Sequence, residues 1–186
     1  MNKELDLNSQ KEFFEAEKLF KEKKFNNALT HYQNILKKFP NHLAVLNNIG
    51  QIFELQGKYE KAMEAFKKCH EINSNEKIFI HNLANIYFLR KDFINSMPLL
   101  KKIIDIGLDH EGNCEKYAIC LFNTKAFKET KDFITSIHLK YSKNDLLNRL
   151  LGRSLLNLNS HEEGLKYLQS SHGFIQLTPN GIKYLT

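Results

Sequence analysis

The sequence predicts an all-α protein built from a repeated pair of helices. The first observation is residues 43–76, where apolar and small residues recur three and four positions apart in two successive runs. The second is that the same pattern returns in steps of 34 residues along most of the chain. The third is that helical spacing stops after Gly173. Because side chains three and four positions apart share one face of a helix, these observations predict stacked helix pairs followed by a short non-helical segment.

Residues 43–76 show how each helix pair is built. Counted from Leu43 as position 1, the first helix has apolar residues at positions 4, 7 and 11, and the second at positions 17, 20, 24 and 27. Gly50 and Ala62 hold positions 8 and 20, where small residues let the two backbones approach. Gly57, at position 15, is expected to take the left-handed conformation that ends the first helix. One pair cannot bury both apolar stripes, so it must stack on copies of itself.

The 34-residue frame fits five consecutive copies after a tail at residues 1–8. The copies are residues 9–42, 43–76, 77–110, 111–144 and 145–178, which predict about ten helices. The repeat domain spans residues 9–173, because the last copy runs into the final segment. Ser9 and Glu12 have the spacing of a capping box that begins the first helix. Pro98 falls inside the second helix of the third copy, where we expect it to bend or loosen that helix.

The repeat resembles the tetratricopeptide repeat (TPR). The residues that carry the resemblance in the second copy are Leu46, Ile49, Gly50, Phe53, Gly57, Tyr59, Ala62, Phe66 and Cys69. The resemblance covers residues 9 to about 172 and implies a right-handed superhelical α-solenoid whose first helices line a concave face. Two departures affect loop geometry more than fold. Thr130 replaces the usual alanine in the fourth copy, and Pro40 has no counterpart in the next three copies, which carry Ser74, Leu108 and Ser142.

Charge and cysteine content restrict the environment of the protein. The net charge of +6 could attract nucleic acid or an anionic membrane, but lysine on solvated helix faces explains it more simply. Three cysteines and a polar start without an apolar leader favour a reducing compartment, so we expect a cytoplasmic protein. No stretch approaches the roughly 18 apolar residues that span a bilayer, so we expect no membrane association.

No arrangement of residues predicts catalysis or cofactor binding. His110, Cys114 and Cys120 are spaced too irregularly for structural zinc, and Cys114 occupies a core position. The sequence has no phosphate-binding loop, zinc-protease motif or nucleophile elbow. We therefore expect a protein that is not an enzyme and takes no cofactor, metal ion or small-molecule substrate.

The resemblance implies where a partner would bind. In this family the concave groove is lined mainly by positions 2, 5, 6, 9, 12 and 13 of the first helices. The candidates at these positions are Asn47, Asn48, Gln51, His81, Asn82, Asn85, Phe88, Lys116, Phe122, Arg149 and Arg153. We expect Asn82, Asn85 and Phe88 to be exposed on the concave side, and amides there can pair with a peptide backbone.

Two known groove types can be compared with this one. Asn48 and Asn82 share position 6 and match part of the asparagine ladder in repeats similar to those of O-linked N-acetylglucosamine transferases, although asparagine is also common there for other reasons. The two-carboxylate clamp that binds chaperone tails is not matched. Only Asn48 fits it, and the positions that need other residues are held by Phe13, Glu17, Ile78 and Asn82.

The sequence therefore predicts a non-catalytic scaffold or adaptor that holds a peptide or helix of a partner protein in its concave groove. Two alternatives remain open. The repeats could be the adaptor region of a larger enzyme of the oxygenase, sulfotransferase or glycosyltransferase type, or they could form a basic RNA-associated scaffold, although we do not expect nucleic acid as the partner.

The final segment, residues 174–186, has the pattern of an extended hairpin. Thr178, Pro179, Asn180 and Gly181 suit a tight turn, and apolar residues flank it on both sides. We expect this segment to fold back as a cap on the last repeat or to act as a linker. Homo-oligomer formation through the C-terminal end is the alternative.

Overall fold

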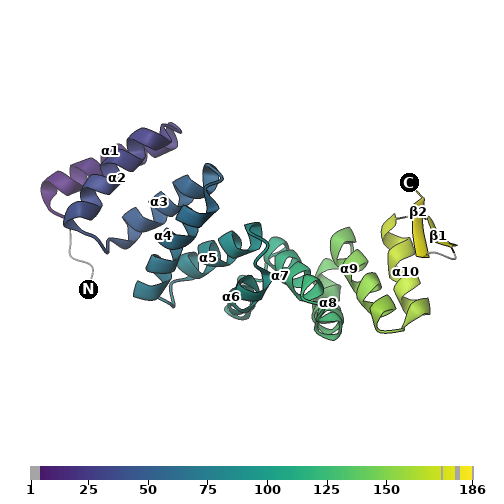
Figure 1. Cartoon of the computed structure of the whole chain (residues 1–186). Helices are drawn as coiled ribbons and strands as arrows, with labels where there is room; N and C mark the ends of the chain where they lie inside the picture. The colour runs from purple at the N-terminus through teal and green to yellow at the C-terminus, as the bar shows by residue number, and fades with distance from the viewer. Residues whose placement is uncertain (1–4, 173, 179–180, 186) are drawn as a thin grey trace. The chain divides into compact units, whose positions relative to one another are not determined.

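The computed structural model describes residues 5–172, 174–178 and 181–185. Backbone contacts divide the chain into two compact units, Met1–Asp92 and Phe93–Thr186, which we call the N-terminal unit and the C-terminal unit. Figure 1 traces the elements from α1 in purple to β2 in yellow. The N-terminal unit contains α1 (Leu7–Lys21), α2 (Phe25–Lys38), α3 (Leu43–Leu55), α4 (Tyr59–Ile72) and α5 (Lys77–Leu89). The C-terminal unit contains α6 (Phe93–Asp105), α7 (Glu111–Asn123), α8 (Phe127–Tyr141), α9 (Asp145–Asn157), α10 (His161–His172), β1 (Phe174–Thr178) and β2 (Gly181–Leu185).

The helices follow the 34-residue frame closely. In copies two to five, the first helix starts at position 1, which is Leu43, Lys77, Glu111 and Asp145. The second helix of each copy starts at position 17. The pairs α1 and α2, α3 and α4, and α9 and α10 pack against each other within their units. The predicted all-α fold class, made of helix-turn-helix repeats with a non-helical C-terminal segment, is confirmed.

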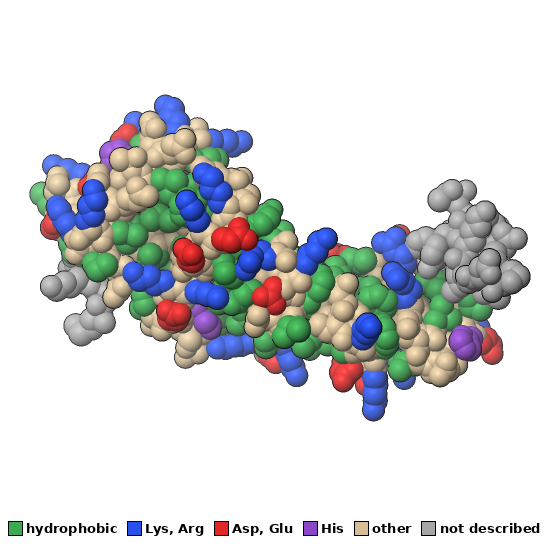
Figure 2. All heavy atoms as spheres, in the orientation of Figure 1, with side chains coloured by type: hydrophobic (Ala, Val, Ile, Leu, Met, Phe, Trp, Pro, Cys, Tyr) green, Lys and Arg blue, Asp and Glu red, His purple; other side chains and the backbone are tan. Residues whose placement is uncertain are grey.

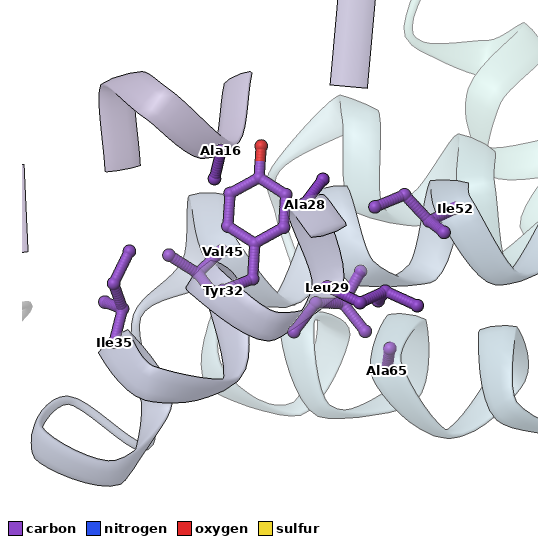
Figure 3. Packing of buried hydrophobic residues seen from close by; sticks show 9 residues of the cluster. Ala16, Ala28, Leu29, Tyr32, Ile35, Val45, Ile52 and Ala65 are labelled. Carbon is purple, nitrogen blue, oxygen red and sulfur yellow. The ribbon is translucent and has the colours of Figure 1, made fainter. Parts of the chain in front are cut away.

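The core of the N-terminal unit surrounds Tyr32 of α2. This side chain is fully buried, and Figure 3 shows its ring among Ala16, Ala28 and Val45. Ala16 and Ala28 occupy positions 8 and 20, where small side chains leave room for the large ring. In the C-terminal unit, a second cluster joins α7, α8 and α9 through Ala118, Ile134, Leu147, Leu150, Leu151 and Leu155.

The small residues at positions 8 and 20 set the distance between paired helices. A Cβ atom on Gly50 would lie 2.5 Å from Cε1 of Phe66, so the glycine makes room for that ring. In the last copy, a Cβ atom on Gly152 would lie 2.8 Å from the carbonyl oxygen of Gly164, and the reverse distance is also 2.8 Å. The backbones of α9 and α10 therefore approach so closely that neither position accepts a side chain without movement.

Each turn between paired helices contains one left-handed residue at position 15. Gly57 was expected to adopt this conformation, with φ of 70°, but Lys23, Lys91, Lys125 and Asn159 adopt it too, with φ between 59° and 63°. The same two hydrogen bonds recur at these helix ends. In α5, for example, the Asp92 N–H donates to the Tyr87 carbonyl and the Lys91 N–H donates to the Phe88 carbonyl, both at 2.9 Å. This pair of bonds defines the Schellman motif, so the turn geometry is kept even without glycine.

Buried asparagines hold two loops that lack the expected proline. The Asn113 side chain donates to the carbonyl of Leu108 at 2.9 Å, and the Asn148 side chain donates to the carbonyl of Ser142 at 2.9 Å. Leu108 and Ser142 occupy the position that Pro40 holds in the first copy. Asn113 is fully buried and Asn148 nearly so. Side-chain hydrogen bonds thus supply the constraint that proline would otherwise provide.

The beginning of α1 corrects one sequence-based expectation. The N-cap is Asp6, whose Oδ1 accepts the Ser9 N–H at 2.7 Å, so the helix begins at Leu7. The capping box predicted for Ser9 and Glu12 is wrong. Aspartate is as good an N-cap as serine, and with Asp6 in that role Ser9 lies buried in the first turn. Glu12 instead accepts a hydrogen bond from Asn34 of α2.

Pro98 does not interrupt its helix, because α6 is continuous from Phe93 to Asp105; whether the proline bends or loosens the helix stays a prediction. Proline removes the donor that would bind the carbonyl of Ile94. The Ile94 side chain is 72% exposed, so this turn of the helix is open to water. The opposite face of α6 buries Ser96, Leu100 and Ile103, and this packing keeps the helix intact despite the lost hydrogen bond.

The C-terminal segment is extended, as predicted. Strands β1 and β2 form an antiparallel pair in which Phe174 lies opposite Leu185 and Thr178 lies opposite Gly181. The expected turn residues Pro179 and Asn180 lie outside the described residues. Whether this hairpin caps the repeats or links them to something else stays a prediction.

The left-handed position 15 generates a stability prediction. Lys91→Gly should raise the free energy of unfolding by about 0.5–1 kcal/mol, because glycine removes the cost of a left-handed side-chain residue but loses more chain entropy on folding. Gly57→Ala should lower the free energy of unfolding by about 1 kcal/mol, because alanine is strained in the left-handed conformation. No steric clash adds to this cost, since no atom lies within 4 Å of the added Cβ. Urea unfolding measures both changes. Lys91→Ala is the control, because it keeps the Cβ; an equal effect of Ala and Gly at this position would contradict the explanation.

The contact between α9 and α10 generates a second prediction. Gly152→Ala should lower the free energy of unfolding by about 1–3 kcal/mol, because the Gly164 carbonyl cannot move without shifting a helix. Gly112→Ala in α7 is the matched control. The nearest atom to its added Cβ is 3.8 Å away, so stability should stay the same or rise by up to about 1 kcal/mol from helix propensity. Thermal unfolding of both variants decides the point, and equal melting temperatures would refute the close approach.

Candidate functional site

An open depression in the N-terminal unit is a candidate site. Its volume is about 390 Å³, and its walls come from the first helices α1, α3 and α5 and from the connection before α5. Ala44 and Ile78 hold position 2 of their copies, Phe13 and Asn47 hold position 5, and Glu17 holds position 9. In tetratricopeptide repeats, these positions are the ones expected to line the concave groove. The full lining is Phe13, Glu17, Leu43, Ala44, Asn47, Asn48, Asn73, Glu76, Ile78 and Phe79.

Ile78 is the large exposed side chain in the apolar part of the depression, which also includes the exposed Ala44. Ile78, at the beginning of α5, is 44% exposed, whereas its neighbour Phe79 is buried. The Phe13 ring packs at a tilt against Tyr32 and His42, with centroid distances of 5.9 and 6.0 Å. Figure 2 shows one face of the molecule, on which apolar side chains of the N-terminal unit lie exposed between acidic and basic ones. An exposed isoleucine in an apolar surround is a suitable contact for an apolar side chain of a partner.

His42 fixes the beginning of α3 beside the depression. Its Nδ1 accepts the Val45 N–H at 3.4 Å, which makes this side chain the N-cap of the helix. Burial lowers the pKa of His42, which favours the neutral ring at neutral pH. Only the neutral ring can accept a hydrogen bond at this nitrogen. The cap and the ring contact with Phe13 therefore hold two walls of the depression together.

The predicted amide ladder is directed mainly at the protein itself. The Asn82 side chain donates to Oδ1 of Asn47 at 2.7 Å, and Asn85 donates to Oε1 of Glu54 at 2.6 Å, so both bonds join α5 to α3. Asn48 donates to the Tyr32 hydroxyl at 2.9 Å and joins α3 to α2. Asn82 is buried, which contradicts the expectation that it is exposed in the groove. The reason is that position 6 faces the preceding repeat, where Asn82 bonds to α3 and Asn48 bonds to α2.

The other sequence-based candidates fall into two sets on different units. Gln51 on α3 and His81 and Phe88 on α5 are half-buried in the N-terminal unit, outside the lining of the depression. Lys116 and Phe122 on α7 and Arg149 and Arg153 on α9 lie in the C-terminal unit. The structure brings Phe122 and Arg153 together, with the guanidinium carbon 4.8 Å from the ring centroid, the geometry of a cation–π contact. The C-terminal set is cationic, whereas the N-terminal set is rich in amides.

The carboxylates of the depression were missed as site residues by sequence reasoning. Glu17 lies on α1, and Glu76 precedes α5 as its N-cap residue, although its side chain makes no capping bond. Within the described residues, no ion pair or side-chain hydrogen bond involves either carboxylate. Reading the groove positions in the first copy would have found Glu17. Glu76 could not be found in that way, because it lies in a connection outside the helical positions.

The three cysteines are structural. Cys69, Cys114 and Cys120 are free and buried, and burial raises their pKa values to about 12, 11 and 11. The Cys69 and Cys114 thiols point to backbone carbonyls of Leu43 and Asp109. Among the residues that the structure describes, no group of three His, Cys, Asp or Glu side chains could hold a metal ion. None of the described helices is long and apolar enough to cross a membrane.

Comparison with known families identifies repeats in the N-terminal unit. Residues 14–42 and 44–76 each match a family model described as tetratricopeptide repeat. No curated protein matches the chain.

Solved structures show the same fold at low sequence identity. YrrB, described as a TPR protein with an unusual peptide-binding site, is 14% identical, with a TM-score of 0.79 over 87% of this chain and 84% of YrrB. MamA of AMB-1 is also 14% identical, with a TM-score of 0.79 over 91% of this chain and 93% of MamA. A double mutant of MamA RS-1 is 10% identical, with a TM-score of 0.76 over 90% and 94% of the two chains. These similarities concern the fold.

The burial of the thiols generates a prediction. In native buffer, maleimide should leave Cys69, Cys114 and Cys120 unmodified for minutes, whereas all three should react at once in urea, because the reactive thiolate is disfavoured in the folded protein.

The raised pKa values of the three thiols also predict that the stability of the protein depends on pH. An unfolded thiol ionises near pH of about 8.5, so this contribution to stability is complete below that pH and is lost as the pH rises towards 11 to 12. Mass spectrometry of labelled protein and urea unfolding at several pH values test these points. Rapid labelling of the native protein would refute them.

Proposed function

Because the chain is a tetratricopeptide repeat protein, we propose that it is a non-catalytic scaffold that binds a peptide or helix of a partner protein, with the depression of the N-terminal unit as the contact site. The observation that carries the proposal is the partly exposed Ile78 within a depression walled by three successive first helices. A volume of about 390 Å³ accommodates a few side chains of a bound segment.

The walls of the depression support binding because they are formed in advance. The bonds from Asn82 to Asn47 and from Asn48 to Tyr32 tie α5 to α3 and α3 to α2. A partner segment would therefore not have to order these helices when it binds, and less of the binding free energy would be lost to conformational entropy. The same bonds explain why groove asparagines are useful without touching the partner.

Two further observations support a binding role. YrrB, whose fold is similar, is described as having a peptide-binding site. The three cysteines are also poor candidates for catalytic nucleophiles, because burial raises their pKa values. We keep a reducing, cytoplasmic compartment as part of this proposal, since all three thiols are free.

The role of Ile78 can be tested with peptides selected on the wild-type protein from a random display library. Ile78→Gln should weaken their affinity about tenfold or more, because it removes an apolar contact from the centre of the site. Ile94→Gln is the matched control: it makes the same change at an isoleucine on α6 that is 72% exposed and outside the depression. Fluorescence anisotropy gives the affinities, and circular dichroism checks the fold. If Ile78→Gln binds the selected peptides as tightly as the control does, the depression is not the binding site.

A further inference from the structure

We propose that the depression of the N-terminal unit selects a segment in which an apolar side chain is flanked by lysine or arginine. This inference rests on the proposed function and adds the chemical class of the partner. It follows from the charges, the hydrogen-bond donors and the apolar surface that line one depression.

The charge of the depression opposes the charge of the whole protein. Its lining contains two carboxylates, Glu17 and Glu76, and no lysine, arginine or histidine. The chain as a whole carries a net charge of +6. The lining of this depression is therefore acidic in a basic protein, and it favours a cationic ligand.

The two carboxylates are available to a ligand. Neither forms an ion pair or side-chain hydrogen bond within the described residues. The nearest basic groups along α1 are Lys18 and Lys21, which line a second depression together with Glu17 but do not pair with it. Two other acidic side chains of the N-terminal unit are used internally: Glu12 bonds to Asn34, and Glu54 bonds to Asn85.

The two carboxylates come from different elements. Glu17 is on α1 and Glu76 precedes α5, so α3 lies between them in the sequence of first helices. The apolar residues Leu43 and Ala44 of α3 line the same depression, as does Ile78. The lining thus combines an apolar surface with acidic groups from separate walls. A segment with an apolar side chain and cations on either side has the matching chemistry.

Asn47 adds a donor for the backbone of the segment. Its Oδ1 accepts the hydrogen bond from Asn82, and no bond from its amide nitrogen is present in the described part of the chain. That N–H₂ group belongs to a side chain that lines the depression. It can therefore donate to a backbone carbonyl of the bound segment, which favours an extended peptide over a helix, whose carbonyls are already bonded.

Two pools of labelled nine-residue peptides test this inference on the full chain. Both pools have a central Leu, Ile or Phe; one has flanks of Lys, Arg, Ser and Gly, and the other has flanks of Asp, Glu, Ser and Gly. Anisotropy at low and physiological salt should show binding of the cationic pool that weakens with salt, and weaker binding of the acidic pool. Glu17→Gln combined with Glu76→Gln should weaken binding of the cationic pool about tenfold and reduce its salt dependence.

The control variant changes the same net charge elsewhere. Glu64→Gln combined with Glu129→Gln alters exposed residues of α4 and α8 outside the depression, and it should leave the affinity within about twofold of wild type. If both double variants weaken binding equally, the effect is one of overall charge and the inference falls. It also falls if the acidic pool binds as tightly as the cationic pool, or if neither pool binds.

Ile78→Gln separates this inference from the function on which it rests. If both pools bind equally and Ile78→Gln abolishes both, the depression binds peptides without the preference for positive charge. If Ile78→Gln leaves peptide binding intact, the proposed function itself falls. Sedimentation tests a different occupant: self-association that Ile78→Gln disrupts would assign the depression to a second copy of the chain and overturn the inference.

Discussion

The packing of each first helix against the preceding second helix is the constraint on which the other features depend. A single helix hairpin leaves one apolar stripe exposed. In α3 and α5 that stripe includes positions 3 and 10, held by Val45, Ile52, Phe79 and Ile86, and all four are buried. The same positions on α1 are the exposed lysines Lys11 and Lys18. Each later first helix is therefore held by its neighbour, whereas α1 presents a charged surface at the start of the array.

This packing also creates the candidate site. Fixing successive first helices side by side brings position 2, 5, 6 and 9 side chains onto one surface. Two side-chain hydrogen bonds then maintain the distances between helices. Asn82 donates to Asn47 and joins α5 to α3, and Asn48 donates to Tyr32 and joins α3 to α2. Because these amides satisfy one another inside the wall, the surface that remains for a partner is formed by Ile78, its apolar neighbours and the carboxylates. Stability and binding thus use different atoms of the same helix faces.

The usual preferences for glycine and proline are followed at some positions of the repeat, and other interactions take their place elsewhere. Gly57 obeys the expected turn chemistry, but three lysines and Asn159 adopt the same left-handed conformation. The hydrogen bonds of the Schellman motif and the packing of both helices outweigh the strain, which is about 1–2 kcal/mol per residue. In the same way, the buried Asn113 compensates for a missing proline, and packing of one face keeps α6 continuous at Pro98. The repeat tolerates these departures because neighbouring copies determine the geometry together.

The sequence by itself determined the class of the fold, the 34-residue frame and the register of the helices, because helical spacing of apolar residues and the size of Gly50 are local properties. It also placed Asn47 and Asn48 near the groove. Only the tertiary structure decided how the side chains are used. Burial of Asn82 depends on a partner 35 residues away, and Glu76 joins the site from a connection whose path no periodicity predicts. Which side chains form hydrogen bonds, and which carboxylates remain without an ion pair, depends on the distances between helices. Tertiary packing sets these distances, and local sequence patterns do not predict them.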